Sequence, residues 1–381
     1  MGYLHPEIEL IQSPKREGHP SGDVATWYRN PAGTVLIVAD GLGSGVTASL
    51  DATLFVSWLK QHLNDGTSLR NAMSSVVRTL RDARHEDVPF AAISVIRIRP
   101  DGGTVVMSYE APPPIVISHR CATLPRPHTV KLATGSVSEF HAHLRPEDGL
   151  MIMSDGITQA GLGADMPRGW TAEGVRKEVH HRAQAGKDLA SIARHVHDRA
   201  RKMSASAQDD TTVAVVRCRE GTVVNILTGP PADPQKDEEV VRRFFQAPGR
   251  RIVCGGTTAE VVTRETGAEM EVEQEVTSDI APPRAVIDGI DLVTEGSLSL
   301  NQAYNILDEA PGKLERDSGV SDLYGYLHRA DRINITVGQA RNPANGDIAF
   351  RQRGILTRDK IVPLLAQKLR EAGKLVEVRW V

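Results

Sequence analysis

The sequence lacks the features that mark several classes of protein. It has no apolar stretch long enough to span a bilayer, and its N-terminus has no basic segment followed by an apolar one, so neither a membrane anchor nor a secretory signal is predicted. The formal net charge is only -3 and no basic run stands out, which argues against a protein that coats nucleic acid. We therefore expect no membrane partner and no nucleic-acid partner.

Cysteine is scarce, and two common phosphate-handling motifs are missing. Cys121, Cys218 and Cys254 lie far apart, so they provide neither a disulfide framework nor a zinc spacing, and a reducing cytoplasm is expected. Cys254 is followed six places later by Glu260, where a cysteine phosphatase of the Cys-x5-Arg type needs arginine. The P-loop pattern GxxxxGK[ST] is also missing, which argues against ATP hydrolysis of that kind.

The chain has the length and composition of a two-domain globular protein. It has 381 residues, of which 40% are hydrophobic and 24% charged, and this is ordinary globular usage. The segment TGPPADPQKDEE is rich in proline and charge and has no apolar periodicity, so it is interpreted as a linker. The predicted organisation is a first domain over residues 1–227, a linker over 228–239 and a second domain over 240–381.

The first domain is predicted to contain short strands in hairpins with a few helices. Strands are expected at 34–40, 91–98, 104–110, 114–119, 149–155 and 211–218, and helices at 47–63, 68–84 and 171–203. Because the strands come in hairpins, the pattern predicts an α+β fold of layered antiparallel sheets flanked by helices, not a doubly wound fold. The second domain is predicted to be α/β, with strands at 251–254, 333–338 and 374–381 and an amphipathic helix at 357–373.

Acids recur at the ends of apolar strands in the first domain. Asp40 ends VLIVAD, Asp155 ends LMIMSD, and Asp209-Asp210 precede TTVAVV. Each Asp-Gly pair alone is more often a simple turn, but the repetition after apolar strands favours a shared site. Converging carboxylates repel one another unless a hard cation neutralises them, and oxygen-only ligands suit Mg²⁺ or Mn²⁺. Two such ions lower the pKa of a water and hold a phosphoryl group during in-line attack.

These acids stand within motifs that resemble a known family. The motifs are Gly22-Asp23, Asp40 to Ala48, Phe90 to Ala92, Glu110 to Pro114, Ser154 to Ala160 and Asp209 to Thr212. Together they resemble the SpoIIE-type branch of the metal-dependent (PPM, protein phosphatase 2C-like) serine/threonine phosphatases, from about residue 20 to 218. Two positions depart from the family pattern. Ser44 replaces a histidine, and Glu110-Ala111 stand where a glycine precedes the paired prolines.

The resemblance implies a fold, a reaction and roles for individual residues. It implies a PPM-type antiparallel β-sandwich flanked by helices, with two Mn²⁺ or Mg²⁺ ions. Asp40 would bridge the ions with help from the Gly41 carbonyl, and Asp155 and Asp209 would complete the catalytic set by holding the first ion. Asp210 and Asp23 would serve the second ion or the outer shell. The implied substrate is phosphoserine or phosphothreonine on a regulatory protein, such as an anti-sigma-factor antagonist.

The second domain resembles no family that we identify. Gly255, Gly256, Thr257 and Thr258 follow a strand and open a helix, which suggests an anion site, although a glycine turn with a threonine cap explains the same pattern. Few aromatic residues are available there to stack on nucleic-acid bases. Two alternatives to a protein phosphatase stay open. One is a sensor whose first domain docks a partner while the second binds an anion, and the other is a phosphatase of small molecules.

Overall fold

The computed structural model describes residues 2–83, 90–132, 135–163, 166–204, 209–272, 285–309, 318–340 and 354–381. The chain forms two compact units. The N-terminal unit comprises Leu4–Tyr28 and Ala32–Glu220, and the C-terminal unit consists mainly of Gly221–Val381. Among the helices of the described residues, none is both long and apolar enough to cross a membrane.

The N-terminal unit contains two antiparallel sheets. The six-stranded sheet has the order β2-β3-β4-β5-β9-β8 and the five-stranded sheet the order β1-β11-β10-β6-β7. The strands are β1 (Leu4–Ser13), β2 (Asp23–Asn30), β3 (Gly33–Gly41), β4 (Ala91–Ile98), β5 (Gly103–Tyr109), β6 (Ile115–Ser118), β7 (Cys121–Thr123), β8 (His128–Leu132), β9 (Gly135–His143), β10 (Gly149–Met153) and β11 (Thr211–Glu220).

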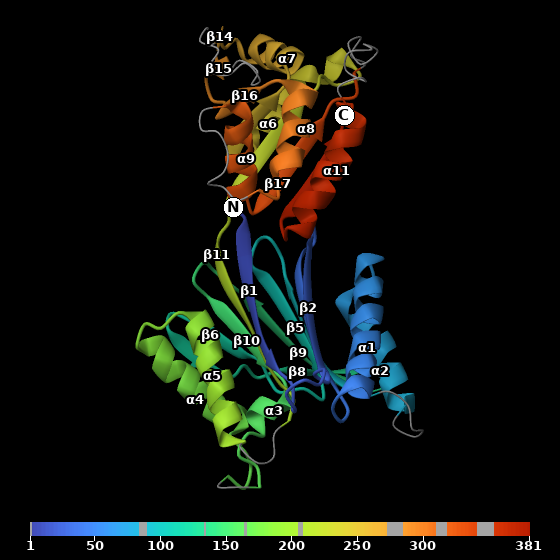
Figure 1. Cartoon of the computed structure of the whole chain (residues 1–381), viewed down its shortest axis with the longest axis vertical. Helices are drawn as coiled ribbons and strands as arrows, with labels where there is room; N and C mark the ends of the chain where they lie inside the picture. The colour runs from blue at the N-terminus through green and yellow to red at the C-terminus, as the bar shows by residue number, and fades with distance from the viewer. Residues whose placement is uncertain are drawn as a thin grey trace. The chain divides into compact units, whose positions relative to one another are not determined.

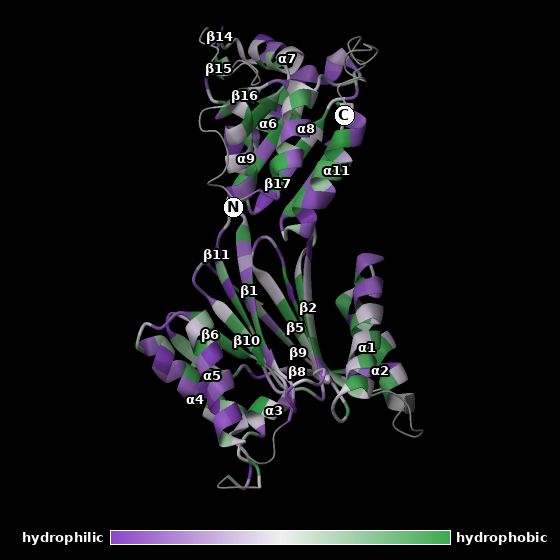
Figure 2. Ribbon diagram, in the orientation of Figure 1, coloured by the Kyte–Doolittle hydropathy of each residue, from purple (hydrophilic) through white to green (hydrophobic). Residues whose placement is uncertain are grey.

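Helices cover the outer face of each sheet (Figure 1). They are α1 (Val46–Asn64) and α2 (Leu69–Ala83) on the six-stranded sheet, α4 (Thr171–Gln184) and α5 (Leu189–Met203) on the five-stranded one, and the short α3 (Asp155–Thr158). The predicted helix over 171–203 is thus two helices, because the chain turns at Gly186 with a left-handed φ of 73°. Many hydrophilic residues lie on α4 and α5 in Figure 2, as expected for helices that bury one face only.

The continuous apolar runs in the sequence are explained by strands that are buried on both faces. In β3, Val35, Ile37 and Ala39 pack toward α1 and α2. The alternate residues, Leu36 and Val38, pack against the inner face of the five-stranded sheet. Because successive side chains of a strand point to opposite faces, such a strand needs apolar residues at every position. The predicted layered antiparallel α+β fold is confirmed.

The C-terminal unit is a doubly wound α/β domain. Its sheet order is β14-β15-β16-β13-β12-β17-β18, and the strands from β16 to β18 are parallel. The strands are β12 (Val223–Thr228), β13 (Arg250–Cys254), β14 (Met270–Val272), β15 (Ala285–Ile287), β16 (Leu292–Thr294), β17 (Arg332–Val337) and β18 (Leu375–Trp380). The helices are α6 (Asp237–Gln246) and α7 (Gly256–Thr266) on one face, and α8 (Gly296–Ile306), α9 (Gly319–Arg329) and α11 (Arg358–Glu371) on the other.

The two units divide earlier in the chain than the sequence suggested. The division falls between Glu220 and Gly221, not after residue 227. The segment predicted as a linker, 228–239, begins at the last residue of β12 and runs into α6. Its prolines and acids have a structural use in this strand-to-helix connection. Asp233 accepts a hydrogen bond from the backbone N–H of Gln235, and acids fill the first turn of α6, where they complement the helix dipole.

Helix α1 allows a direct test of how the helices pack on the six-stranded sheet, because it carries a buried and an exposed side chain close together. Phe55 is 1% exposed in the core beneath α1, whereas Leu50 is 64% exposed. We expect Phe55→Ala to lower the free energy of unfolding by about 3–5 kcal/mol, and Leu50→Ala to change it by less than about 0.5 kcal/mol. Urea unfolding followed by tryptophan fluorescence, with Trp58 packed on the same core, measures both. Equal effects of the two variants would contradict the placement of α1.

Candidate functional site at the edge of the two sheets

The five predicted acids come from both sheets and meet at one edge of the sandwich. Asp40 is the penultimate residue of β3, and Asp23 is the first residue of the neighbouring β2. Asp155 opens α3 directly after β10, and Asp209 and Asp210 precede β11. Asp40 lies within hydrogen-bonding reach of both Asp23 and Asp155. The structure therefore brings the two halves of the predicted site together.

The acids perturb one another strongly. Burial, followed by the charges of Asp23 and Asp155, raises the pKa of Asp40 to about 10. Burial raises the pKa of Asp23 to about 6, although a hydrogen bond from Thr212 opposes the shift. The pKa of Asp155 is also raised, first by burial and then by the charge of Asp209. Several like charges held this closely favour either protonation or a bound cation.

Two hydroxyl residues that the sequence reasoning missed tie the sheets together beside the acids. The Thr212 hydroxyl donates to Oδ2 of Asp23 over 2.7 Å, which links β11 of one sheet to β2 of the other. The Thr212 backbone N–H donates to the hydroxyl of Ser154 over 2.9 Å, and the Ser154 N–H donates to the Thr212 carbonyl over 3.0 Å. All three side chains are buried. The feature of the sequence that could have identified Thr212 and Ser154 is their position, since each lies within two residues of a predicted acid.

The glycines that follow the acids are required by close backbone approach. A Cβ atom on Gly41 would lie 2.1 Å from the carbonyl oxygen of Ala48, in the first turn of α1. A Cβ atom on Gly156 would lie 2.1 Å from the carbonyl oxygen of Asp210. A side chain on Gly41 would push the end of β3 away from α1, and one on Gly156 would push the start of α3 away from Asp210. Glycine therefore sets the spacing of the site as well as the turn.

Lys15 is a further neighbour of the acids, and no sequence motif pointed to it. Its backbone N–H donates to Oδ1 of Asp210 over 2.8 Å, and its ammonium nitrogen lies 3.7 Å from Oδ1 of Asp209. Asp210 is buried, whereas Asp209 is half-exposed. The two adjacent acids therefore differ, because one is fixed by backbone contacts and the other is open to solvent.

The donor set fits a hard divalent cation. Oδ1 of Asp23 and Oδ2 of Asp210 are buried, and neither finds a hydrogen-bond partner within the described ranges. Unsatisfied buried carboxylate oxygens are costly, and a cation would compensate them. Among the described residues, however, no group of three His, Cys, Asp or Glu side chains has the arrangement of a formed metal site. An all-oxygen set suits Mg²⁺ or Mn²⁺ and not zinc.

The predicted anion site in the second domain is partly occupied by the protein itself. Gly255, Gly256 and Thr257 lie at the start of α7 without a side-chain cap. Thr258, however, is buried, and its hydroxyl accepts from the Gly229 N–H over 2.7 Å and donates to the Cys254 carbonyl over 3.3 Å. Its role is to join the ends of β12 and β13, so its hydroxyl is already committed.

Comparison with known proteins places the N-terminal unit. Residues 30–219 match the family described as Stage II sporulation protein E (SpoIIE). The PP2C phosphatase domain of SpoIIE from Bacillus subtilis, solved with a fragment of its regulatory domain, is 18% identical, with a TM-score of 0.49 over 58% of this chain and 66% of that one. The RsbU and RsbW domains of a Mycobacterium tuberculosis protein are 16% identical, with a TM-score of 0.47 over 64% of this chain and 68% of that one.

This chain thus spans just under two thirds of the SpoIIE structure. No curated protein matches the chain at significant similarity. The family match covers Asp40 in β3, Asp155 at the start of α3 and the acids before β11. Residues 30–219 of the N-terminal unit belong to the SpoIIE family.

Proposed function

We propose that the N-terminal unit hydrolyses phosphoserine and phosphothreonine on a regulatory protein, with two Mn²⁺ or Mg²⁺ ions at the acidic edge. The observation that carries the proposal is the meeting of Asp23, Asp40 and Asp155 across two sheets, with buried carboxylate oxygens that lack partners. Membership of the SpoIIE family supports the same reaction. A phosphorylated anti-sigma-factor antagonist is the kind of substrate we propose.

Each acid has a role that its surroundings support. Asp40 interacts with both Asp23 and Asp155, so it would help to hold both ions. Asp155 and Asp209 would hold the first ion, while Asp23 and Asp210, each with one oxygen fixed by a hydrogen bond and one without a partner, would serve the second ion or its outer shell. The Gly41 carbonyl would assist Asp40. When bound, the ions lower the pKa of a water and stabilise charge on the phosphoryl group.

The protein supplies orientation more than proton transfer. Thr212 fixes one oxygen of Asp23 and leaves the other free, and Gln159 donates to Oδ2 of Asp155 over 2.8 Å. Cys218 and Cys254 are buried, and burial raises their pKa to about 12 and about 11, so neither thiol suits nucleophilic attack. These observations argue against a cysteinyl-phosphate intermediate at Cys218 or Cys254.

An exposed apolar stripe favours a protein substrate over a small molecule. Leu42, Val46, Leu50 and Leu54 are between 54% and 71% exposed. Their four-residue spacing places the last three on one face of α1, and Leu42 lies two residues after Asp40. Apolar side chains gathered beside an active site suit contact with the surface of a folded partner.

The first prediction concerns stability without metal. Because the pKa of Asp40 is raised far above the value of about 3.8 for an unperturbed aspartate, the folded state binds more protons than the unfolded state between these values. The stability of the metal-free protein therefore falls as pH rises from 5 to 9. We expect Asp40→Asn to reduce this decline and to raise the melting temperature at pH 8 by roughly a few degrees.

Differential scanning calorimetry in chelator, with added Mn²⁺ as the second condition, measures both effects. The control is Asp51→Asn, which changes a half-buried acid of α1 outside the cluster. Mn²⁺ should stabilise the wild type and the control but not Asp40→Asn. A metal-free Asp40→Asn protein that is less stable than wild type at pH 8 would contradict the charge cluster.

The second prediction concerns catalysis. Turnover of a phosphoserine peptide should require Mn²⁺ or Mg²⁺, and Asp40→Asn should lower kcat by about 10²-fold or more, because the bridging carboxylate is lost. Asp51→Asn should retain wild-type kcat. Full activity of the wild type in chelator, or near wild-type turnover by folded Asp40→Asn at saturating Mn²⁺, would refute the proposed reaction.

The third prediction separates protein from small-molecule substrates. Leu50→Asp should raise KM for a folded phosphoprotein by about tenfold and leave kcat/KM for p-nitrophenyl phosphate unchanged, because the substitution alters the docking face and not the acids. Steady-state kinetics with both substrates measures this. Equal loss on both substrates, or no loss on either, would show that the stripe on α1 does not contact the substrate.

A further inference from the structure

The C-terminal unit has a switch in winding direction at its centre. Strand β12 lies between β13 and β17 and is parallel to both. The connection from β12 to β13 runs through α6 on one face, and that from β17 to β18 runs through α11 on the other. In open α/β sheets the carboxyl ends of the strands at such a point are where ligands bind. Residues 229–230 and 338–340, which directly follow Thr228 and Val337, lie at this edge.

A cation lies at this edge without a paired carboxylate. Arg358 is the first residue of α11, and its Nη1 donates to the carbonyl of Gly338 over 2.6 Å. Its guanidinium rests against Gly229, where an added Cβ would lie 1.3 Å from Nη1. Within the described ranges no carboxylate forms an ion pair with Arg358, and burial lowers its pKa. A half-buried guanidinium without a counter-ion favours an anion.

Unsatisfied hydroxyls and uncapped helices adjoin the same edge. Thr228, the last residue of β12, is fully buried, and its hydroxyl has no partner among the described residues. Ser299, in the second turn of α8, is also fully buried with an unpartnered hydroxyl. Helices α7 and α8 begin in contact, since a Cβ on Gly296 would lie 3.4 Å from the Cα of Gly255, and neither has a side-chain cap. Free helix N-termini favour negative charge.

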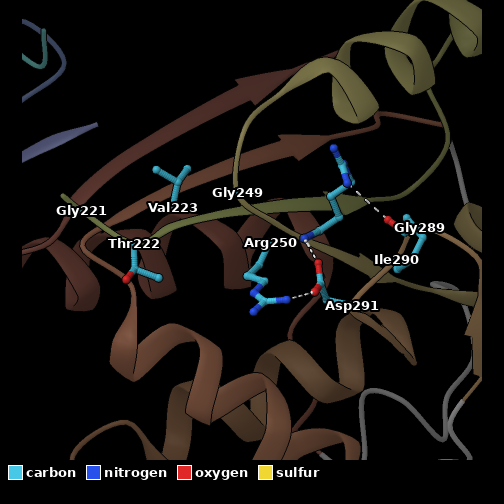
Figure 3. Close-up of a pocket in the computed structure, with 9 residues that line it drawn as sticks. Gly221, Thr222, Val223, Gly249, Arg250, Gly289, Ile290 and Asp291 are labelled. Atoms are coloured by element: carbon cyan, nitrogen blue, oxygen red, sulfur yellow. Dashed lines mark hydrogen bonds and ion pairs between the residues drawn. The ribbon is translucent and has the colours of Figure 1, made fainter. Parts of the chain in front are cut away.

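The opposite edge of the sheet provides a contrast (Figure 3). A cavity of about 570 Å³ lies there and is lined by Arg250, Arg251 and Asp291 among others. Arg250 is already paired there, since its Nη1 lies 2.6 Å from Oδ1 of Asp291, while Arg251 donates to the Phe245 carbonyl over 2.7 Å. Within the described residues, the charge of Arg250 is therefore paired with a carboxylate, whereas that of Arg358 is not.

We propose that the carboxyl edge of the C-terminal sheet, where β12 and β17 meet, binds a small phosphorylated metabolite. Arg358 pairs with the phosphate, and the Thr228 hydroxyl donates to it. The glycines after β12 and β17 allow the close contact of the two loops, since a Cβ on Gly338 would lie 2.0 Å from the carbonyl oxygen of Pro230. Nucleotides and sugar phosphates both carry the phosphate group that such a site would bind. The site is separate from the acidic edge of the N-terminal unit and would add ligand binding to its activity.

Isothermal titration calorimetry of the full chain in chelator tests the proposal, with inorganic phosphate, AMP and glucose 6-phosphate as probes. Chelator removes any contribution from divalent ions at the acidic edge, so the result does not depend on the phosphatase activity. At least one probe should bind, and the nucleotide and sugar arms identify the source of the phosphate. We expect Arg358→Gln to weaken that binding by about 30-fold or more, and Arg250→Gln, the matched control at the opposite edge, to leave it unchanged.

Thr228→Val provides a second variant that should fold even if Arg358→Gln does not. It removes an unsatisfied buried hydroxyl without changing the shape of the side chain, so the ligand-free melting temperature should not fall, while affinity drops about tenfold. Lack of binding by all three probes at millimolar concentration would overturn the proposal. Wild-type affinity in a folded Thr228→Val protein, or equal effects of Arg358→Gln and Arg250→Gln, would also overturn it.

Discussion

The close burial of like charges is the constraint around which the N-terminal unit is built. Asp23 and Asp40 belong to one sheet and Asp155 to the connection after a strand of the other, so the acids meet only while the two sheets stay packed. The apolar layer between the sheets, with Val38 from β3 and Ile152 from β10, resists their separation. The hydrophobic core thus holds together an edge that electrostatic repulsion alone would open.

This arrangement shows a common conflict between stability and function. Oδ1 of Asp23 and Oδ2 of Asp210 have no hydrogen-bond partner among the described residues, although the Thr212 hydroxyl satisfies the other oxygen of Asp23. Replacing them with neutral residues would relieve repulsion but remove the ligands that a cation needs. Active sites commonly retain such unfavourable groups because the ligand compensates them when it binds.

The sequence was sufficient to locate the acids but not their partners. Asp40 and Asp155 could be predicted because each follows an apolar strand and precedes glycine, a pattern that is local in the sequence. The contact between them could not be derived from spacing, since it depends on how two sheets pack. Thr212 and Lys15 were missed for the same reason, because their contacts with Asp23 and Asp210 join segments nearly 200 residues apart.

Composition misled the prediction of the domain boundary. The prolines and acids after Thr228 suggested a linker, and the apolar run of β12 was therefore assigned to the preceding domain. In the structure β12 is a central strand of the parallel sheet, with partners that begin at Arg250 and Arg332. The sequence of a short apolar strand does not indicate which sheet the strand joins, because this depends on partner strands that lie far away in the sequence.

The pairing of β1 with β11 has a consequence for how the chain is made. Leu4 lies opposite Glu220 and Ser13 opposite Thr211, so the first strand of the N-terminal unit pairs with the last strand of that unit. During synthesis β1 has no partner strand until more than 200 residues have followed. Its partner is β11, and β11 in turn pairs with β10. The five-stranded sheet is therefore completed late, and the acidic edge, which needs both sheets, is assembled only when the whole unit has emerged.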